Sequence, residues 1–132
     1  MKNLIRTAAA ALVLLFSSCA GNVDLNGKWE IVSVGGETVE ATETNPYLEF
    51  NTADGKVHGH TGCNLMNGKF TLDGKKLSFS NMATTMMAGP DMDLERSVLD
   101  AINSTASVKK ASKDMVEVFD ADGNQLMELR KK

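Results

Sequence analysis

Apolar and polar residues alternate along most of the chain with a period of two, which is the pattern of β-strands that bury one face. The alternation predicts strands over these segments: residues 28–34, 47–51, 56–60, 69–72, 76–80, a segment around Val108, 115–120 and 125–129. Asp-Gly pairs, which favour tight hairpin turns, occupy residues 54–55, 73–74 and 122–123. Residues 37–45 and 81–90 follow no such pattern and are expected to be surface loops, the second with three methionines and Pro90.

One segment has helical spacing instead. Its apolar residues fall on a single helical face: Leu94, Val98, Ala101 and Ile102. The carboxylate of Asp91 or Asp93 can cap the first turn, and Asn103-Ser104 ends the helix. The chain is therefore predicted to be mainly β, with seven or eight short antiparallel strands and one helix before the last strands. Closing such a sheet into a barrel removes its exposed edges, and the helix then plugs one opening or covers one face.

A secretory signal precedes the first strand. Lys2 and Arg6 open the chain, an uncharged apolar run follows over residues 8–16, and Ser17-Ser18 leads to Cys19. The run is too short to span a bilayer, which takes about 20 apolar residues. A cysteine directly after small residues resembles the lipobox of bacterial lipoproteins. Residues 1–18 are thus predicted to be a lipoprotein signal peptide, Cys19 the acylated membrane anchor, residues 19–24 a tether and residues 25–132 the folded domain.

The residues beyond the anchor bear on location and partners. Ala20 follows Cys19 in place of the acidic residue that retains many lipoproteins at the inner membrane, so an outer-membrane lipoprotein is expected. Facing the periplasm is the first expectation, and display on the cell surface is the alternative. Loss of the signal changes the formal net charge from −3 to about −5. An acidic domain without a basic cluster is a poor binder of nucleic acid.

Three segments together resemble the META domain, the family of the bacterial heat-shock protein HslJ. They are Leu25–Trp29, Gly59–Asn64 with the following Gly68, and Ala83–Ala88 before the helix. The resemblance covers roughly residues 25–130. It implies a lipocalin-like antiparallel barrel or cracked barrel with one helix, often in lipoproteins or envelope proteins associated with stress tolerance. It implies no enzyme activity and no cofactor.

The residues that carry the resemblance are interpreted as structural: Trp29, Gly59, Gly62, Cys63, Asn64, Gly68, Thr85, Met87 and Ala88. Trp29 is the largest apolar anchor and should lie in the core. Gly59 and Gly62 are expected where a side chain would block the backbone. Asn64 is expected to bond to nearby backbone and shape a bend.

Cysteine and histidine give a candidate metal or redox site. The family often has a second cysteine where Gly89 stands here, so Cys63 cannot form that disulfide. A free cysteine is usually buried and inert, and reactivity is the alternative. On a strand His58 and His60 are expected to point to one face, and a bend could bring the Cys63 thiolate near them. Zinc usually takes four ligands, however, so two exposed histidines beside a buried cysteine are the simpler interpretation.

Methionines form a second unusual group. Met66, Met82, Met86, Met87 and Met92 fall in one part of the chain. Thioethers suit Cu(I), but they are also flexible core fillers and frequent at adaptable apolar surfaces. A candidate ligand rim is therefore predicted from four of them: Met66, Met82, Met86 and Met87.

No catalytic constellation is evident in the sequence. Cys63 with His58 or His60 is the one candidate nucleophile–base pair, and no third member is apparent. Phosphate-loop and zinc-protease motifs are lacking. The sequence predicts a non-enzymatic envelope protein that binds an apolar ligand, a lipid or another envelope protein. The alternatives are a metal-binding or thiol-redox protein, and a structural stress protein without a ligand.

Overall fold

The computed structural model describes residues 23–40, 45–89 and 92–132 of the 132-residue chain. The predicted signal peptide, Cys19, Ala20, Pro90 and the capping candidate Asp91 lie outside the described residues. The elements, in chain order, are β1 (Gly27–Val34), β2 (Glu37–Thr38), β3 (Tyr47–Asn51), β4 (Lys56–His60), β5 (Leu65–Asp73), β6 (Lys76–Thr84), α2 (Met92–Ser104), β7 (Ser107–Ser112), β8 (Met115–Phe119) and β9 (Gln125–Lys131).

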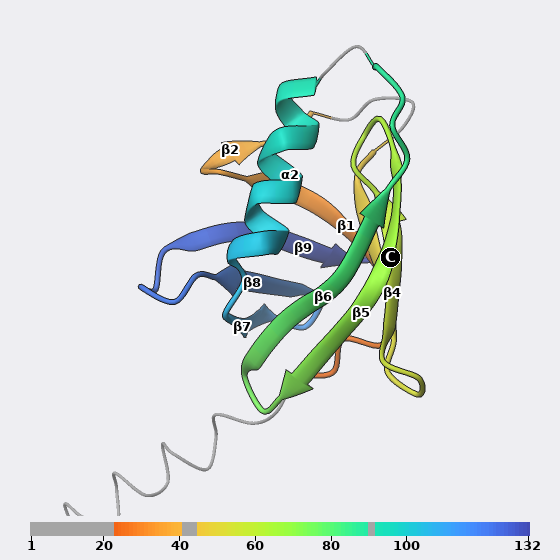
Figure 1. Cartoon of the computed structure of the whole chain (residues 1–132). Coiled ribbons are helices and arrows are strands. Elements are labelled where there is room, and N and C mark those ends of the chain that lie inside the picture. Colours follow the sequence, from red (N-terminus) through yellow and green to blue (C-terminus); the bar gives the residue numbers. More distant parts are fainter. Residues whose placement is uncertain (1–22, 41–44, 90–91) are drawn as a thin grey trace, which may run out of the picture.

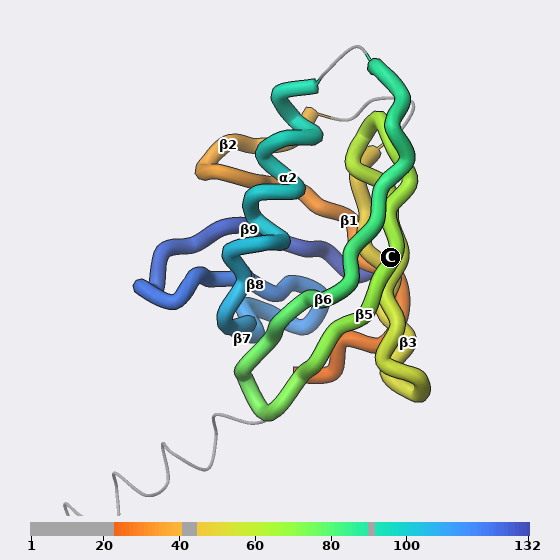
Figure 2. The backbone as a smooth tube through the Cα atoms, in the orientation of Figure 1, coloured from red at the N-terminus to blue at the C-terminus, as the bar shows by residue number. Residues whose placement is uncertain are grey.

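The strands form one ring-like antiparallel sheet, which confirms the predicted mainly-β cracked barrel (Figure 1). Strands β3 to β9 pair in chain order, and β1 pairs with both β3 and β9. The ring is weakest between β6 and β7, which share the single register pair Lys76 and Ser107. Helix α2 connects these two strands and lies across the opening between β6 and the β8–β9 side (Figures 1 and 2).

The interior of the barrel is filled by apolar side chains from every side of the ring. Phe50, Met127 and Leu129 are among the fully buried residues, and Trp29 is buried as predicted. The Trp29 indole N–H donates a hydrogen bond of 2.8 Å to the carbonyl of Leu25. The predicted apolar face of the helix packs on this core through four residues: Leu94, Val98, Ala101 and Ile102. Alternation identified the buried face in most strands, whereas in β1 a register shift after Ile31 places Val34 rather than Ser33 in the core.

The described domain begins before the predicted boundary at residue 25. Val23 is buried and belongs to the same apolar cluster as the barrel core. Asp24 accepts a hydrogen bond of 3.0 Å from the backbone N–H of Asn26. These two residues therefore belong to the folded part, although the sequence placed them in the tether.

Two loop predictions are wrong in part. Residues 37–38 form β2, which pairs with the end of β1 across a Gly35-Gly36 turn. Residues 81–84 belong to β6, which runs on to Thr84 after a register shift opposite Gly68. The strand was missed because this β-bulge interrupts the period-two alternation from which strands were predicted.

Candidate functional site

The bend between β4 and β5 depends on two glycines, as predicted. A Cβ atom on Gly59 would lie 2.1 Å from the backbone oxygen of Tyr47 on the neighbouring strand. Gly62 has a φ of +100°, which disfavours any residue with a side chain. The close approach at Gly59 and the left-handed turn at Gly62 direct the following residues, Cys63 and Asn64, toward the start of the helix.

Asn64 is the centre of a buried hydrogen-bond network. Its side chain is 1% exposed. The amide nitrogen donates to a carboxyl oxygen of Glu95 at 2.6 Å and to the Met87 carbonyl at 2.9 Å. The amide oxygen accepts from the Thr85 hydroxyl and from the Met87 backbone N–H, both at 2.7 Å. Asn64 does bond to backbone, as expected, but the backbone groups belong to Met87, more than twenty residues away in sequence.

Thr61 and Glu95 complete this network, which we call the polar node: Thr61, Asn64, Thr85, Glu95 and the backbone of Met87. The Thr61 hydroxyl donates to Glu95 at 2.8 Å and accepts the backbone N–H of Asn64 at 2.9 Å. Both side chains are buried. Within the described residues, no buried side-chain nitrogen or oxygen lacks a partner. The polar node thus joins the β4–β5 bend, the β6–α2 connection and the first turn of α2.

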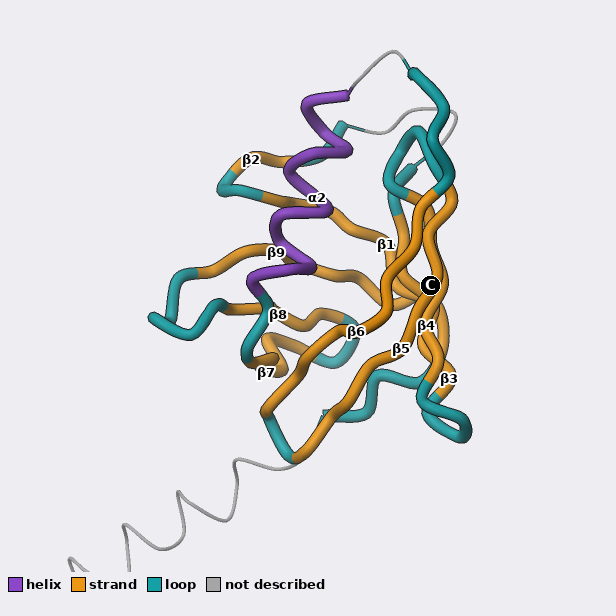
Figure 3. The backbone as a smooth tube through the Cα atoms, in the orientation of Figure 1, coloured by secondary structure: helices purple, strands orange, loops and turns teal. Residues whose placement is uncertain are grey.

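Several exposed apolar side chains lie at the same end of the molecule as the polar node. In the described part of the chain, the large apolar side chains with high exposure are Leu65, Met86, Met87 and Met92, and we call this set the methionine lip. Met86 is 94% exposed. The residues come from the start of β5, the β6–α2 connection and the start of α2, which meet at one end of the molecule (Figure 3). The first described residues lie at the opposite end (Figure 1).

The predicted ligand rim is only partly at the surface. Met66 is 1% exposed and belongs to the core, and Met82 is half-buried against the core. Met86 and Met87 do reach the surface. Leu65 was not predicted as a member, because its place at the start of β5 was not recognised.

Cys63 lies next to Gly89, the position at which the family resemblance implies a second cysteine. A Cβ atom on Gly89 would be 2.0 Å from the Cys63 sulfur and 2.9 Å from its Cβ. The half-buried thiol contacts the Met87 carbonyl at 3.4 Å. The absence of a side chain at Gly89 therefore makes room for Cys63. A cysteine at position 89 would lie beside the Cys63 sulfur, and its Cβ would have to move outward from 2.9 Å to reach the usual Cβ–Cβ separation of about 3.5–4.5 Å in a disulfide.

The structure gives the candidate metal ligands separate partners. Nε2 of His58 is 3.7 Å from a Glu49 carboxyl oxygen, whereas Nδ1 of His60 accepts the Gly62 backbone N–H at 2.9 Å. The rings of both histidines lie near Tyr47, and Cys63 faces Met87. No group of three His, Cys, Asp or Glu side chains among the described residues is placed to hold a metal ion.

Taken together, these features define a helix-closed, cracked antiparallel barrel with a polar node under an exposed apolar end. The model of the META domain family matches residues 22–132. The chain belongs to the META domain family.

Solved structures show the same fold at low sequence identity. A protein from Burkholderia xenovorans, solved by NMR, has a TM-score of 0.62 and 21% identity, over 82% of this chain and 83% of that one. A DUF4847 family protein from Bacteroides vulgatus has a TM-score of 0.61 and 11% identity, over 82% of this chain and 94% of that one. Another NMR structure gives a TM-score of 0.63 at 18% identity, over 80% and 89% of the two chains.

Family membership suggests a non-enzymatic, envelope-type protein. No curated protein sequence matches the chain significantly. Among the described residues, no helix is both long enough and apolar enough to cross a membrane.

Proposed function

We propose that this protein is a lipid-anchored, non-enzymatic envelope protein that binds another envelope protein through its methionine lip. The observation that carries the proposal is the exposure of Met86 and Met87 on a segment fixed by the polar node. Exposed apolar side chains are unfavourable in water, and a contiguous group of them is typical of interaction sites. Methionine suits such a site because its flexible side chain adapts to the partner.

The polar node explains why the methionine lip stays exposed. Asn64 binds both the N–H and the carbonyl of Met87, and Thr85 is held by the same side chain. With its backbone fixed in this way, the segment cannot turn its methionines into the core. The core itself is already filled by residues such as Phe50 and Leu129, which favours an external partner over an apolar ligand inside the barrel.

The predicted anchor supports a protein partner rather than a lipid bilayer. Three residues separate Cys19 from the buried Val23, so the domain would begin within about 14 Å of an acylated Cys19. The first described residues and the methionine lip are at opposite ends of the domain (Figure 1). A domain anchored in this way presents the methionine lip away from its own membrane, toward other proteins of the envelope.

The anchor and the methionine lip are tested separately. Mass spectrometry of the protein from host membranes should find a chain that begins at an acylated Cys19, and Cys19→Ser should leave the membrane fraction. A photoreactive residue in place of Met86 should give a discrete protein adduct in whole cells. The matched control is the same residue in place of the exposed Lys113, in the β7–β8 turn. Adducts to lipid alone, or the same adducts from both positions, would contradict the proposal.

A further inference from the structure

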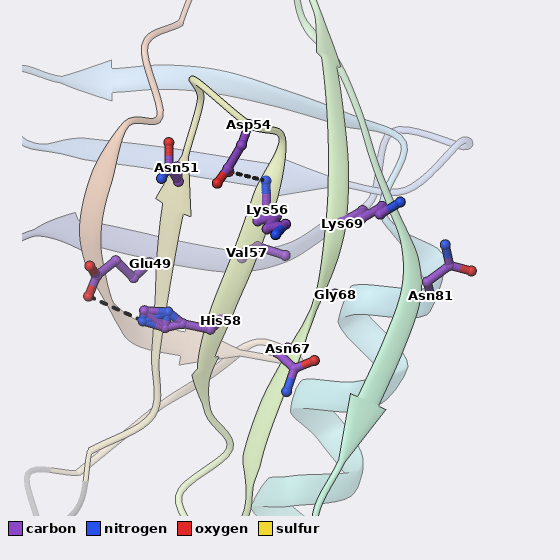
Figure 4. Close-up of a pocket in the computed structure, with 10 residues that line it drawn as sticks. All are labelled: Glu49, Asn51, Asp54, Lys56, Val57, His58, Asn67, Gly68, Lys69 and Asn81. Carbon is purple, nitrogen blue, oxygen red and sulfur yellow. Dashed lines mark hydrogen bonds and ion pairs between the residues drawn. The ribbon is translucent and has the colours of Figure 1, made fainter.

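A groove of about 560 Å³ lies on the outer face of strands β3 to β6 (Figure 4). In this view helix α2 lies behind the sheet. The groove is lined by Glu49, Asn51, Asp54, Lys56, Val57, His58, Asn67, Gly68, Lys69 and Asn81. Asn67 lies two residues from Leu65 on the same face of β5, so the groove begins next to the methionine lip. The proposed partner binding rests on Met86 and Met87 and makes no use of the groove.

Strand register arranges the groove side chains in two rows. Asn51, Lys56 and Lys69 are direct neighbours across β3, β4 and β5. Glu49, His58 and Asn67 form the second row across the same strands. Because adjacent strands are about 4.8 Å apart, the rows present polar groups at a spacing comparable to the width of one sugar ring.

A β-bulge shapes the β6 side of the groove. A Cβ atom on Gly68 would lie 2.9 Å from both the Met82 Cα and the Ser80 oxygen, so β5 must lack a side chain where the bulged part of β6 approaches it. Asn81 has a φ of +53°, and it is the one non-glycine residue with positive φ in the described ranges. Bulges redirect side chains beside functional sites, and unusual backbone angles concentrate there.

Several groove side chains have unused hydrogen-bonding capacity. Glu49 pairs with His58, and the Asn51 and Asp54 carbonyl or carboxyl oxygens accept N–H groups of their own turn. The amides of Asn67 and Asn81 and the ammonium groups of Lys56 and Lys69 bond to no other described residue. Lys56 also stands directly opposite Lys69, and like charges in this arrangement destabilise a sheet.

We infer that this groove binds an uncharged, hydroxyl-rich ligand, a saccharide. Three Asn amides each supply a donor and an acceptor, and hydroxyl groups need both. The formal charges of the two carboxylates and the two lysines cancel. A strongly charged ligand, whether anionic or cationic, would therefore be repelled by two of these four groups. An apolar ligand would leave these polar side chains, which make up most of the lining, without hydrogen-bond partners.

The test uses NMR on the labelled protein purified in detergent from the membranes of its host. The probes are a trisaccharide of N-acetylglucosamine, maltotriose and inorganic phosphate, each titrated separately. At least one saccharide should shift the side-chain NH₂ signals of Asn67 and Asn81. Asn81→Gly keeps the backbone conformation that Asn81 adopts, and it should weaken this binding about 3- to 10-fold, as expected for one lost hydrogen bond.

Two further variants separate a groove effect from a general one. Asn67→Ala, in the other wall of the groove, should weaken saccharide binding to a similar extent. Asn103→Ala, at the exposed end of α2, should leave it unchanged. No shift with either saccharide, shifts with phosphate alone, or equal binding by Asn81→Gly and the parent would overturn the inference. None of these results depends on whether Met86 crosslinks to a partner.

Discussion

Replacing Asn64 with alanine tests the polar node, because this change removes its central side chain. Four hydrogen bonds are lost, one of them to the Glu95 carboxyl group. Glu95 keeps one described partner, the Thr61 hydroxyl. The Met87 N–H loses its partner and the Met87 carbonyl keeps only the Cys63 thiol, beside an exposed surface where water can replace the lost bonds in part.

The expected destabilisation follows from these four bonds. A neutral hydrogen bond contributes about 1 kcal/mol and one to a charged group about 1.5–3 kcal/mol. The simple total is about 5 kcal/mol, and replacement by water at Met87 lowers it, so we expect Asn64→Ala to cost about 3–4 kcal/mol. A typical domain is stable by only about 5–15 kcal/mol. The variant should therefore still fold, but with little free energy of unfolding left.

Urea denaturation of the parent and the variant measures this loss. The midpoint should fall with little change in the slope, which marks a change in stability rather than in the extent of unfolding. Asn67→Ala is the matched control, because Asn67 is exposed and its loss should cost less than about 0.5 kcal/mol. A cost below about 1 kcal/mol for Asn64→Ala would refute the view that the polar node fixes this end of the molecule.

Three further changes have definite expected outcomes. Gly89→Cys should bridge to Cys63 on mild oxidation and raise stability by about 3 kcal/mol, and two free thiols by mass spectrometry would contradict the closeness of residues 63 and 89. Gly59→Ala should lower the free energy of unfolding by about 3 kcal/mol or more, or prevent folding, because its Cβ would meet a backbone oxygen of β3. Calorimetry measures this loss, and an unchanged melting temperature would contradict it. The Asn124 backbone N–H holds the pKa of Asp120 below its ordinary value of 3.8, so this carboxylate stabilises the β8–β9 turn above that value and loses the effect as pH falls through the lower folded pKa. Asp120→Asn should thus be less stable than the parent near neutral pH and should match it more closely in strong acid, as followed by urea midpoints.

Local patterns in the sequence were sufficient for most of the barrel. Alternation and Asp-Gly turns predicted the strands that bury one face. They include the β5–β6 hairpin, in which Asp73 pairs with Lys76 across the turn. Helical spacing predicted the buried face of α2. The two-residue strand β2 and the end of β6 were missed because pairing, rather than alternation, makes them strands. A bulge at Asn81 and Met82 shifts the period-two alternation of β6, and no residue type near it in the sequence indicates that a bulge is present.

The site was less predictable because its parts meet only in the folded chain. Asn64 and Thr85 were singled out through the family resemblance, but Thr61 and Glu95 were not. A glutamate in the first turn of a helix is ordinary in sequence, and only its burial against Asn64 distinguishes it. The methionines were noticed as a group, yet burial divides them between the core and the methionine lip, and the spacing of residues 66, 82 and 86 contains no sign of that division.

The most direct test of the account combines the polar node with the proposed partner. A photoreactive residue at position 86 is introduced into cells that carry either the parent chain or Asn64→Ala, and adducts are compared at equal amounts of folded, membrane-bound protein. The account predicts a discrete protein adduct with the parent chain and loss of most of it with Asn64→Ala, because the methionine lip is no longer held in place. An equal yield of the same adduct from both chains would contradict the claim that the polar node positions a binding surface.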